Sequence, residues 1–114
     1  MAVDMAEDRL GEIIASRAIE AVYPDGRRTT LGIQIGRPRP NPDKSGDWEC
    51  PCRIQGLGDS PVWTMYGVDS VQALTQAAEV LRRALTSAAA DHALTFRWDG
   101  EDAAQALPVD DVLW

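Results

Sequence analysis

Basic and aromatic side chains gather in and just after a proline-rich stretch of this chain, Gly36–Asp47. A guanidinium group carries five N–H donors in one plane and binds carboxylate or phosphate oxygens through paired hydrogen bonds. An extended loop that carries such groups beside aromatic rings is therefore a candidate site for a small anionic ligand or a phosphate group. The predicted ligand-binding residues are Arg37, Arg39, Lys44 and Trp48, with Arg53 and Trp63 nearby in the sequence.

The same arginines also have a structural interpretation. Three acids lie close to them in the sequence, and ion pairs with these acids would hold the loop in place instead of binding a ligand. The candidate acidic partners are Asp43, Asp47 and Asp59. The sequence alone leaves both interpretations of the loop open.

Two thiols, Cys50 and Cys52, stand two residues apart in a segment of alternating polarity, which places both on one face of a strand. A structural metal centre needs about four ligands, and the chain adds only one histidine, His92, to its two cysteines. We therefore expect both thiols to be reduced, metal-free and buried beside Ile54 under a helix, as small apolar side chains. His92 is expected near a helix C-terminus, where it complements the helix dipole.

No spacing in the chain matches a paired nucleophile and base or a phosphate-binding glycine loop. We therefore expect no enzymatic activity and no cofactor.

The chain carries a formal net charge of −7, and its acidic residues concentrate at the two ends. This balance disfavours nucleic-acid binding, which requires neutralisation of phosphates. It either keeps the protein soluble or attracts a basic protein partner. The acidic surface that would meet such a partner consists of Asp99, Glu101, Asp102, Asp110 and Asp111. The spacing of the first three does not fit an EF-hand loop, so no metal site is predicted there.

Alternating apolar residues predict the strands that would position these groups. The first two predicted strands flank a turn at Pro24–Gly26 and form a β-hairpin. The four predicted strands are Ile13–Tyr23, Thr30–Ile35, Trp48–Leu57 and Val62–Gly67.

Prolines shape the loop and one of these strands. Pro38, Pro40 and Pro42 exclude a helix and predict an extended, polyproline-like loop over Gly36–Asp47. Pro51 lies within a predicted strand and indicates a bulge or an edge position there.

One long helix is predicted from Asp69 to about Ala90. Asp69 is a good N-cap, and Gln72 three residues later completes a capping-box pattern. Leu94, Phe96 and Trp98 alternate after the helix and indicate a fifth strand. The predicted apolar stripe of the helix consists of Val71, Leu74, Ala78, Leu81, Leu85 and Ala88.

These elements predict an α+β fold, an antiparallel β-meander of about four strands with one long helix packed on one face. We expect one domain over residues 1–114, with residues 1–12 a loose N-terminal tail and residues 99–114 an acidic C-terminal segment. Neither a membrane-spanning apolar run nor a signal peptide is found, so a cytoplasmic protein that does not bind membranes is expected. The preference for arginine over lysine, together with abundant alanine, points to a bacterial source.

Four short motifs occur together: GRPRP at Gly36–Pro40, GDWECP at Gly46–Pro51, IQGLG at Ile54–Gly58 and GVDSVQAL at Gly67–Leu74. In combination they resemble a family of small bacterial proteins that carry a domain of unknown function. The resemblance spans roughly residues 14–98 and implies no activity. Cys52 departs from the family pattern, in which an aromatic residue stands at this position.

Charge and size favour a non-enzymatic protein-interaction module, for example an immunity-type or antitoxin-type protein that covers a basic partner. The alternative is a protein that binds a small anion or phosphate group through Arg37 and Arg39.

Overall fold

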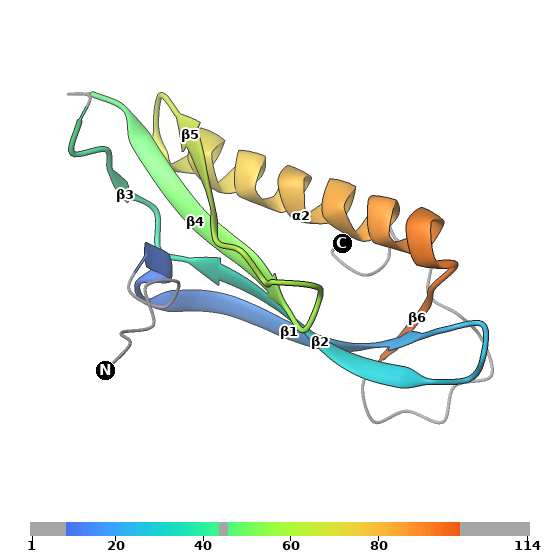
Figure 1. The fold of residues 1–114 in the computed structure, drawn as a ribbon. Helices are drawn as coiled ribbons and strands as arrows, with labels where there is room; N and C mark the ends of the chain where they lie inside the picture. Colours follow the sequence, from blue (N-terminus) through green and yellow to red (C-terminus); the bar gives the residue numbers. More distant parts are fainter. Residues whose placement is uncertain (1–8, 44–45, 99–114) are drawn as a thin grey trace.

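An antiparallel sheet covered on one face by one long helix forms the structure, a computed structural model that describes residues 9–43 and 46–98 (Figure 1). The six strands and the helix follow one another as β1 (Ile13–Val22), β2 (Arg28–Gly36), β3 (Arg39–Pro40), β4 (Trp48–Gln55), β5 (Trp63–Gly67), α2 (Ser70–His92) and β6 (Thr95–Trp98).

The β1–β2 hairpin forms as the sequence predicts. Gly26 adopts a φ of 91°, which suits glycine, and its amide donates to the carbonyl of Tyr23 at 3.0 Å. Asp25 accepts from the amide and the Nε of Arg27 at 3.0 and 2.7 Å. These hydrogen bonds lower the pKa of Asp25 below its ordinary value. The turn thereby fixes the hairpin register, in which Ile19 lies opposite Leu31.

Strand β4 lies in the middle of the sheet. One of its sides pairs with β5, and the other pairs first with β3 and then with β2. Pro51 lies where this neighbour changes from β3 to β2, and the pairing with β5 runs through it without a shift. The predicted bulge or edge position for Pro51 is therefore wrong, because the gap between β3 and β2 along this side of β4 accommodates a residue that lacks an N–H group.

Strand β6 returns after the helix and pairs with the free side of β1, where Trp98 lies opposite Ile19. Helix α2 crosses the sheet over β4 and β5, as Figure 1 shows. The α+β fold with an antiparallel meander and a helix on one face is confirmed. In the described part of the chain, no helix is both long enough and apolar enough to cross a membrane.

The helix faces the sheet through a different stripe in its first half than the sequence predicts. Val71 is 70% exposed and Leu74 and Ala78 are only partly buried, whereas Ala73 and Ala77 are fully buried. The second half agrees with the prediction: Leu81, Leu85 and Ala88 are buried.

Close contact between the strand and the helix explains the shift. A Cβ on Gly67, at the end of β5, would lie 2.5 Å from the amide nitrogen of Ala73. The Cys52 thiol donates to the carbonyl of Ala77 at 3.8 Å. Only small side chains fit between the backbones at this distance, so alanines face the sheet and the larger Val71 points to solvent.

The predicted helix start is confirmed. Asp69 accepts from the amide of Gln72 at 2.8 Å, and the Gln72 side chain accepts in return from the amide of Val68, also at 2.8 Å. The helix ends at His92, two residues later than predicted, because Ala93 adopts a left-handed conformation with a φ of 52°.

Residues 9–12 belong to the folded structure, which corrects the prediction of a loose tail through residue 12. Arg9 and Leu10 are helical, and Leu10 is 1% exposed. The carbonyl of Glu12 accepts from the amide of Arg37 at 2.8 Å, just after β2. The apolar Leu10 side chain and this hydrogen bond attach the segment to the end of the sheet.

The corrected helix stripe predicts a contrast in stability. Leu81→Ala should lower the free energy of unfolding by about 2–5 kcal/mol, since it leaves a cavity between helix and sheet. Val71→Ala should change it by less than about 0.5 kcal/mol, because Val71 is mostly exposed. Urea denaturation of both variants measures the difference. Equal losses would show that the stripe is misplaced.

Candidate functional site

A cavity of about 550 Å³ lies at the end of the sheet where β2, β3 and the start of α2 meet. It contains three of the four residues that the sequence predicts to bind a ligand: Arg37, Arg39 and Trp48. The fourth, Lys44, lies outside the described residues. The complete lining consists of Gly11, Glu12, Arg37, Pro38, Arg39, Pro40, Trp48 and Ser70.

The segment 9–12 forms one wall of the cavity because it crosses closely over Gly36. A Cβ on Gly36 would lie 2.2 Å from the carbonyl oxygen of Leu10 and 2.7 Å from Cγ of Pro51. Only glycine leaves room for this crossing. The chain then turns at Gly11, with a φ of 68°, and brings Glu12 beside Arg37.

The opposite wall comes from the pairing of β3 with β4. The Gly36–Asp47 stretch is predicted as an extended loop, and two of its residues pair as the short strand β3. Arg39 lies opposite Glu49, and Pro40 lies opposite Trp48. The amide of Asn41 then donates to the carbonyl of Asp47 at 2.9 Å. This pairing determines which side chain each arginine meets.

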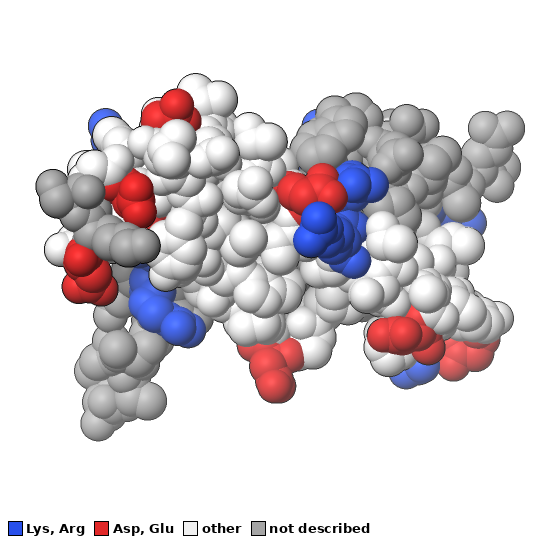
Figure 2. All heavy atoms as spheres, turned by 90° about the horizontal axis from the view of Figure 1, so that it is seen from above, with Lys and Arg blue, Asp and Glu red and all other residues white. Residues whose placement is uncertain are grey.

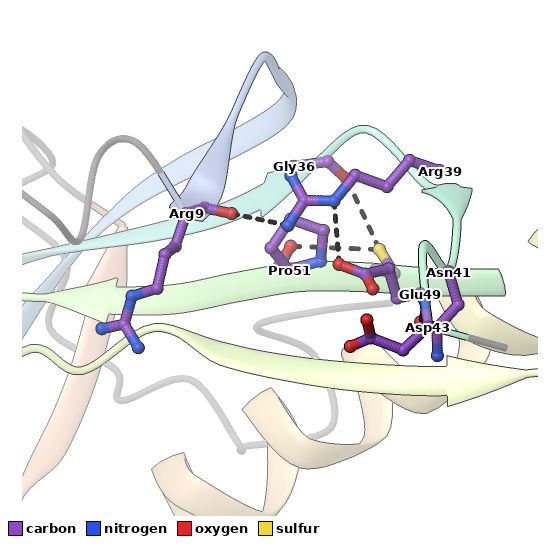
Figure 3. Close-up of polar contacts among 8 residues, drawn as sticks. Arg9, Gly36, Arg39, Asn41, Asp43, Glu49 and Pro51 are labelled. Carbon is purple, nitrogen blue, oxygen red and sulfur yellow. Dashed lines mark hydrogen bonds and ion pairs between the residues drawn. The ribbon is translucent and has the colours of Figure 1, made fainter.

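Arg39 is held by two contacts (Figure 3). Its Nε donates to Oε2 of Glu49 at 2.9 Å, and its Nη2 donates to the carbonyl of Arg9 at 3.0 Å. Glu49 is 8% exposed, so loss of Arg39 would leave a buried carboxylate without its ion-pair partner. Arg39 therefore joins three segments of the chain: the crossing segment, β3 and β4.

Arg37 is held more weakly. Its Nη1 lies 3.2 Å from Oε2 of Glu12, and the two side chains are 72% and 67% exposed. An ion pair this exposed contributes little to stability, about 0–1 kcal/mol. The Arg37 guanidinium can therefore exchange its partner for a ligand at little cost.

The arginines of the loop do form ion pairs with acids, one of the two interpretations that the sequence allows, but the acids are not the predicted ones. Glu49 and Glu12 pair with the arginines in place of the predicted Asp43, Asp47 and Asp59. Asp43 instead donates its amide to the side chain of Asn41 at 2.9 Å. Glu12 lies 25 residues before Arg37, so no local pattern in the sequence could reveal it.

Trp48 and Ser70 complete the cavity. Trp48 is half-buried at the start of β4 and packs partly against the core. Ser70 is the first residue of α2, where the helix dipole places partial positive charge. The cavity thus combines a largely exposed guanidinium, an aromatic ring and the start of a helix.

Two other predicted neighbours of the loop lie elsewhere. Arg53 is 6% exposed in β4, and its Nε donates to the Gln34 side chain at 2.7 Å on the sheet. Trp63 packs against the core from β5.

A second hollow of about 530 Å³ lies beyond the Arg39–Glu49 pair and has the opposite charge. Its lining residues are Asn41, Asp43, Asp47, Glu49 and Tyr66.

Figure 2 shows the helix side of the molecule, where charged groups are few and of mixed sign. On α2, for example, Glu79 pairs with Arg82 at 2.7 Å and with Arg83 at 3.3 Å, and these contacts lower its pKa. The described residues contain as many acidic as basic side chains. The predicted acidic surface at Asp99, Glu101, Asp102, Asp110 and Asp111 lies outside the described residues, so it stays a prediction.

The predicted burial of the two cysteines is confirmed. Both are fully buried and free, and the Cys50 thiol donates to the carbonyl of Gly36 at 3.4 Å. Burial raises the pKa of Cys50 to about 11 and that of Cys52 to about 12. Both thiols are therefore protonated at neutral pH and are poor nucleophiles and metal ligands.

The other chemical groups give no second centre. Across residues 9–43 and 46–98, no cluster of three or more His, Cys, Asp or Glu could hold a metal ion. His92 is exposed in the last turn of α2 and makes an edge-on contact with Tyr23, with ring centroids 6.5 Å apart.

Comparison with known proteins identifies a family. A family model described as a domain of unknown function, DUF6968, matches residues 15–109. No curated protein and no solved structure matches the chain.

The two arginines should differ in their effect on stability. Arg39→Ala leaves the buried Glu49 carboxylate without its partner and should lower the free energy of unfolding by about 1–3 kcal/mol. Arg37→Ala breaks only an exposed pair and should cost less than about 1 kcal/mol. Thermal and urea unfolding of both variants test this order. The reverse order would make Arg37 the residue that holds the loop.

The buried thiols should resist modification in the folded protein. At pH 8, a disulfide reagent such as Ellman's should react at least about 100-fold more slowly with the native protein than with the urea-unfolded chain, because burial suppresses the thiolate. Similar rates in both states, or stoichiometric zinc in the purified protein, would contradict this account of Cys50 and Cys52.

Proposed function

The chain belongs to the family of the domain of unknown function DUF6968, and we propose that it is a binding module without catalytic activity. Its ligand is a small molecule that carries a phosphate or carboxylate group, and its site is the cavity at Arg37 and Trp48. The observation that carries the proposal is the Arg37 side chain, which is 72% exposed and faces this cavity.

The cavity supplies what an anionic group needs. The Arg37 guanidinium offers planar donors to two oxygens of a phosphate or carboxylate. The nearby start of α2 at Ser70 adds a favourable dipole. The Trp48 ring, together with Pro38 and Pro40, presents apolar surface to the rest of the ligand.

The walls are ordered before a ligand arrives. Arg39 is bonded to Glu49 and to the Arg9 carbonyl, and prolines restrict the backbone on both sides of it. A preformed site loses little conformational entropy on binding. The ligand must displace Glu12 from Arg37, and this exposed ion pair is easily broken.

The charged cavity favours this function over the predicted complex with a basic partner. That complex depends on acidic residues at 99–111, which lie outside the described residues. A basic partner would also meet Arg37 and Arg39 unfavourably if it approached the cavity. Among the described residues, the acidic hollow at Asp43, Asp47 and Glu49 is what an immunity-type or antitoxin-type function could use.

Phenyl phosphate, which joins an anion to a flat ring, is a suitable probe. Isothermal titration should show 1:1 binding that weakens with salt. Arg37→Ala should reduce the affinity about 10-fold or more, because a hydrogen bond to a charged group contributes about 1.5–3 kcal/mol. Glu12→Gln should raise the affinity about two- to five-fold, since it removes the competing carboxylate.

Arg83→Ala is the matched control. Arg83 is 76% exposed and pairs with Glu79 at 3.3 Å, close to the values for Arg37 and Glu12, but it lies on α2 and not in the cavity. Its replacement should leave phenyl phosphate binding unchanged. Equal losses for the two variants would mean that the probe responds only to overall charge, and the proposal would fail.

A further inference from the structure

The carboxylate of Glu12 lines the same cavity as the guanidinium of Arg37. For a simple anion, Glu12 is a competitor that must leave Arg37 before the anion can bind. The displaced carboxylate then has no partner and lies next to the negative charge of the ligand. Like charges at short range repel each other, so a purely anionic ligand loses part of what it gains at Arg37.

The backbone fixes the positions from which both side chains extend. The carbonyl of Glu12 accepts from the amide of Arg37 at 2.8 Å. Leu10 is 1% exposed, and the close crossing over Gly36 holds this segment against the sheet. The two charged side chains nevertheless remain 67% and 72% exposed. The cavity therefore presents one negative and one positive group from fixed backbone positions, and we name Glu12 and Arg37 the charge doublet.

The other charge in the lining is already balanced. Arg39 is the third charged residue among those that line the cavity, and its Nε donates to the buried carboxylate of Glu49 at 2.9 Å. The cavity consequently offers a ligand one positive and one negative group, with no excess of either sign. A ligand with one charge of each sign matches this balance, whereas a multiply charged anion does not.

We propose that the cavity binds a zwitterionic α-amino acid with an aromatic or other apolar side chain, an inference that rests on the proposed function and names its ligand class. The α-carboxylate accepts from the Arg37 guanidinium, and the α-ammonium group donates to the Glu12 carboxylate. Both groups of an amino acid are bonded to the same carbon atom, so their opposite charges are close neighbours. The charge doublet has the same character, with Nη1 of Arg37 3.2 Å from Oε2 of Glu12. Both charges of the doublet therefore stay paired when the ligand is bound.

The rest of the lining suits the side chain of such a ligand. Trp48 is half-buried, and Pro38 and Pro40 line the cavity with it. An aromatic ring of the ligand can pack face to face or edge-on against the Trp48 ring. Ser70 adds a hydroxyl group, which can accept from an ammonium group or donate to a carboxylate.

Three forms of one amino acid test the proposal on the wild-type protein. Isothermal titration at about pH 6, where an α-amino group is protonated, compares L-phenylalanine with two derivatives. N-acetyl-L-phenylalanine keeps only the negative charge, and L-phenylalanine amide keeps only the positive charge. The zwitterion should bind at least about 10-fold more tightly than either derivative, because each derivative lacks one hydrogen bond between charged groups.

Glu12→Gln should change the affinities of the two classes of ligand in opposite directions. It should weaken L-phenylalanine binding about 5–10-fold, because the ammonium group loses its carboxylate partner. It should tighten the binding of N-acetyl-L-phenylalanine and phenyl phosphate about two- to five-fold, because it removes a competitor. Arg37→Ala should weaken the binding of all three. Glu20→Gln is the matched control and should change none of them, because Glu20 pairs with Arg28 at the same distance of 3.2 Å but lies outside the cavity.

The possible results distinguish a failure of this inference from a failure of the proposed function. Phenyl phosphate that binds through Arg37 while L-phenylalanine binds no better than its N-acetyl derivative would overturn the amino-acid ligand and leave the anion site. Tighter binding of L-phenylalanine to Glu12→Gln, or binding that Arg37→Ala leaves unchanged, would also overturn it. A protein that binds neither phenyl phosphate nor any form of phenylalanine would overturn both proposals.

Discussion

The crossing of residues 9–12 over Gly36 is the constraint on which the candidate site depends. At this point a backbone carbonyl and a proline ring occupy the space that any Cβ would need. The crossing buries Leu10, aligns the carbonyl of Arg9 with Arg39 and brings Glu12 to Arg37. Without it the cavity would lack one wall, and the two arginines would lose their present partners.

Two arginines two residues apart consequently have different roles. The short β3–β4 pairing places Arg39 against Glu49, whose carboxylate is almost completely buried. Burial strengthens the interaction and makes each partner costly to remove. Arg37 lines the cavity with a side chain that is 72% exposed, so water weakens its pair with Glu12. The guanidinium group of Arg39 therefore stabilises the structure, whereas that of Arg37 remains available for binding a ligand.

The sequence predicts the elements that depend on local patterns. Alternation locates the hairpin and the central strands, and Asp69 with Gln72 locates the helix start. Prediction fails where the structure depends on close backbone approach. The alanines at 73 and 77 face the sheet because Gly67 and Cys52 leave no room for larger residues, and hydrophobicity alone favours Val71 instead.

The site is predictable only in part for a related reason. The types of Arg37, Arg39 and Trp48 indicate an anion-binding surface, and the structure does bring them to one cavity. Their partners Glu12 and Glu49 come from distant segments that meet through tertiary packing. Pro51 is a further case in which tertiary pairing decides the outcome. It can lie within a central strand because it falls between the part of β4 that pairs with β3 and the part that pairs with β2.

A crystal structure of the protein with phenyl phosphate tests the central claim most directly. The account predicts the phosphate oxygens within hydrogen-bonding distance of the Arg37 guanidinium and the phenyl ring against Trp48. It also predicts that Arg39 keeps its contacts with Glu49 and the Arg9 carbonyl. A phosphate that binds Arg39 after displacing Glu49, or that lies outside this cavity, would contradict the account.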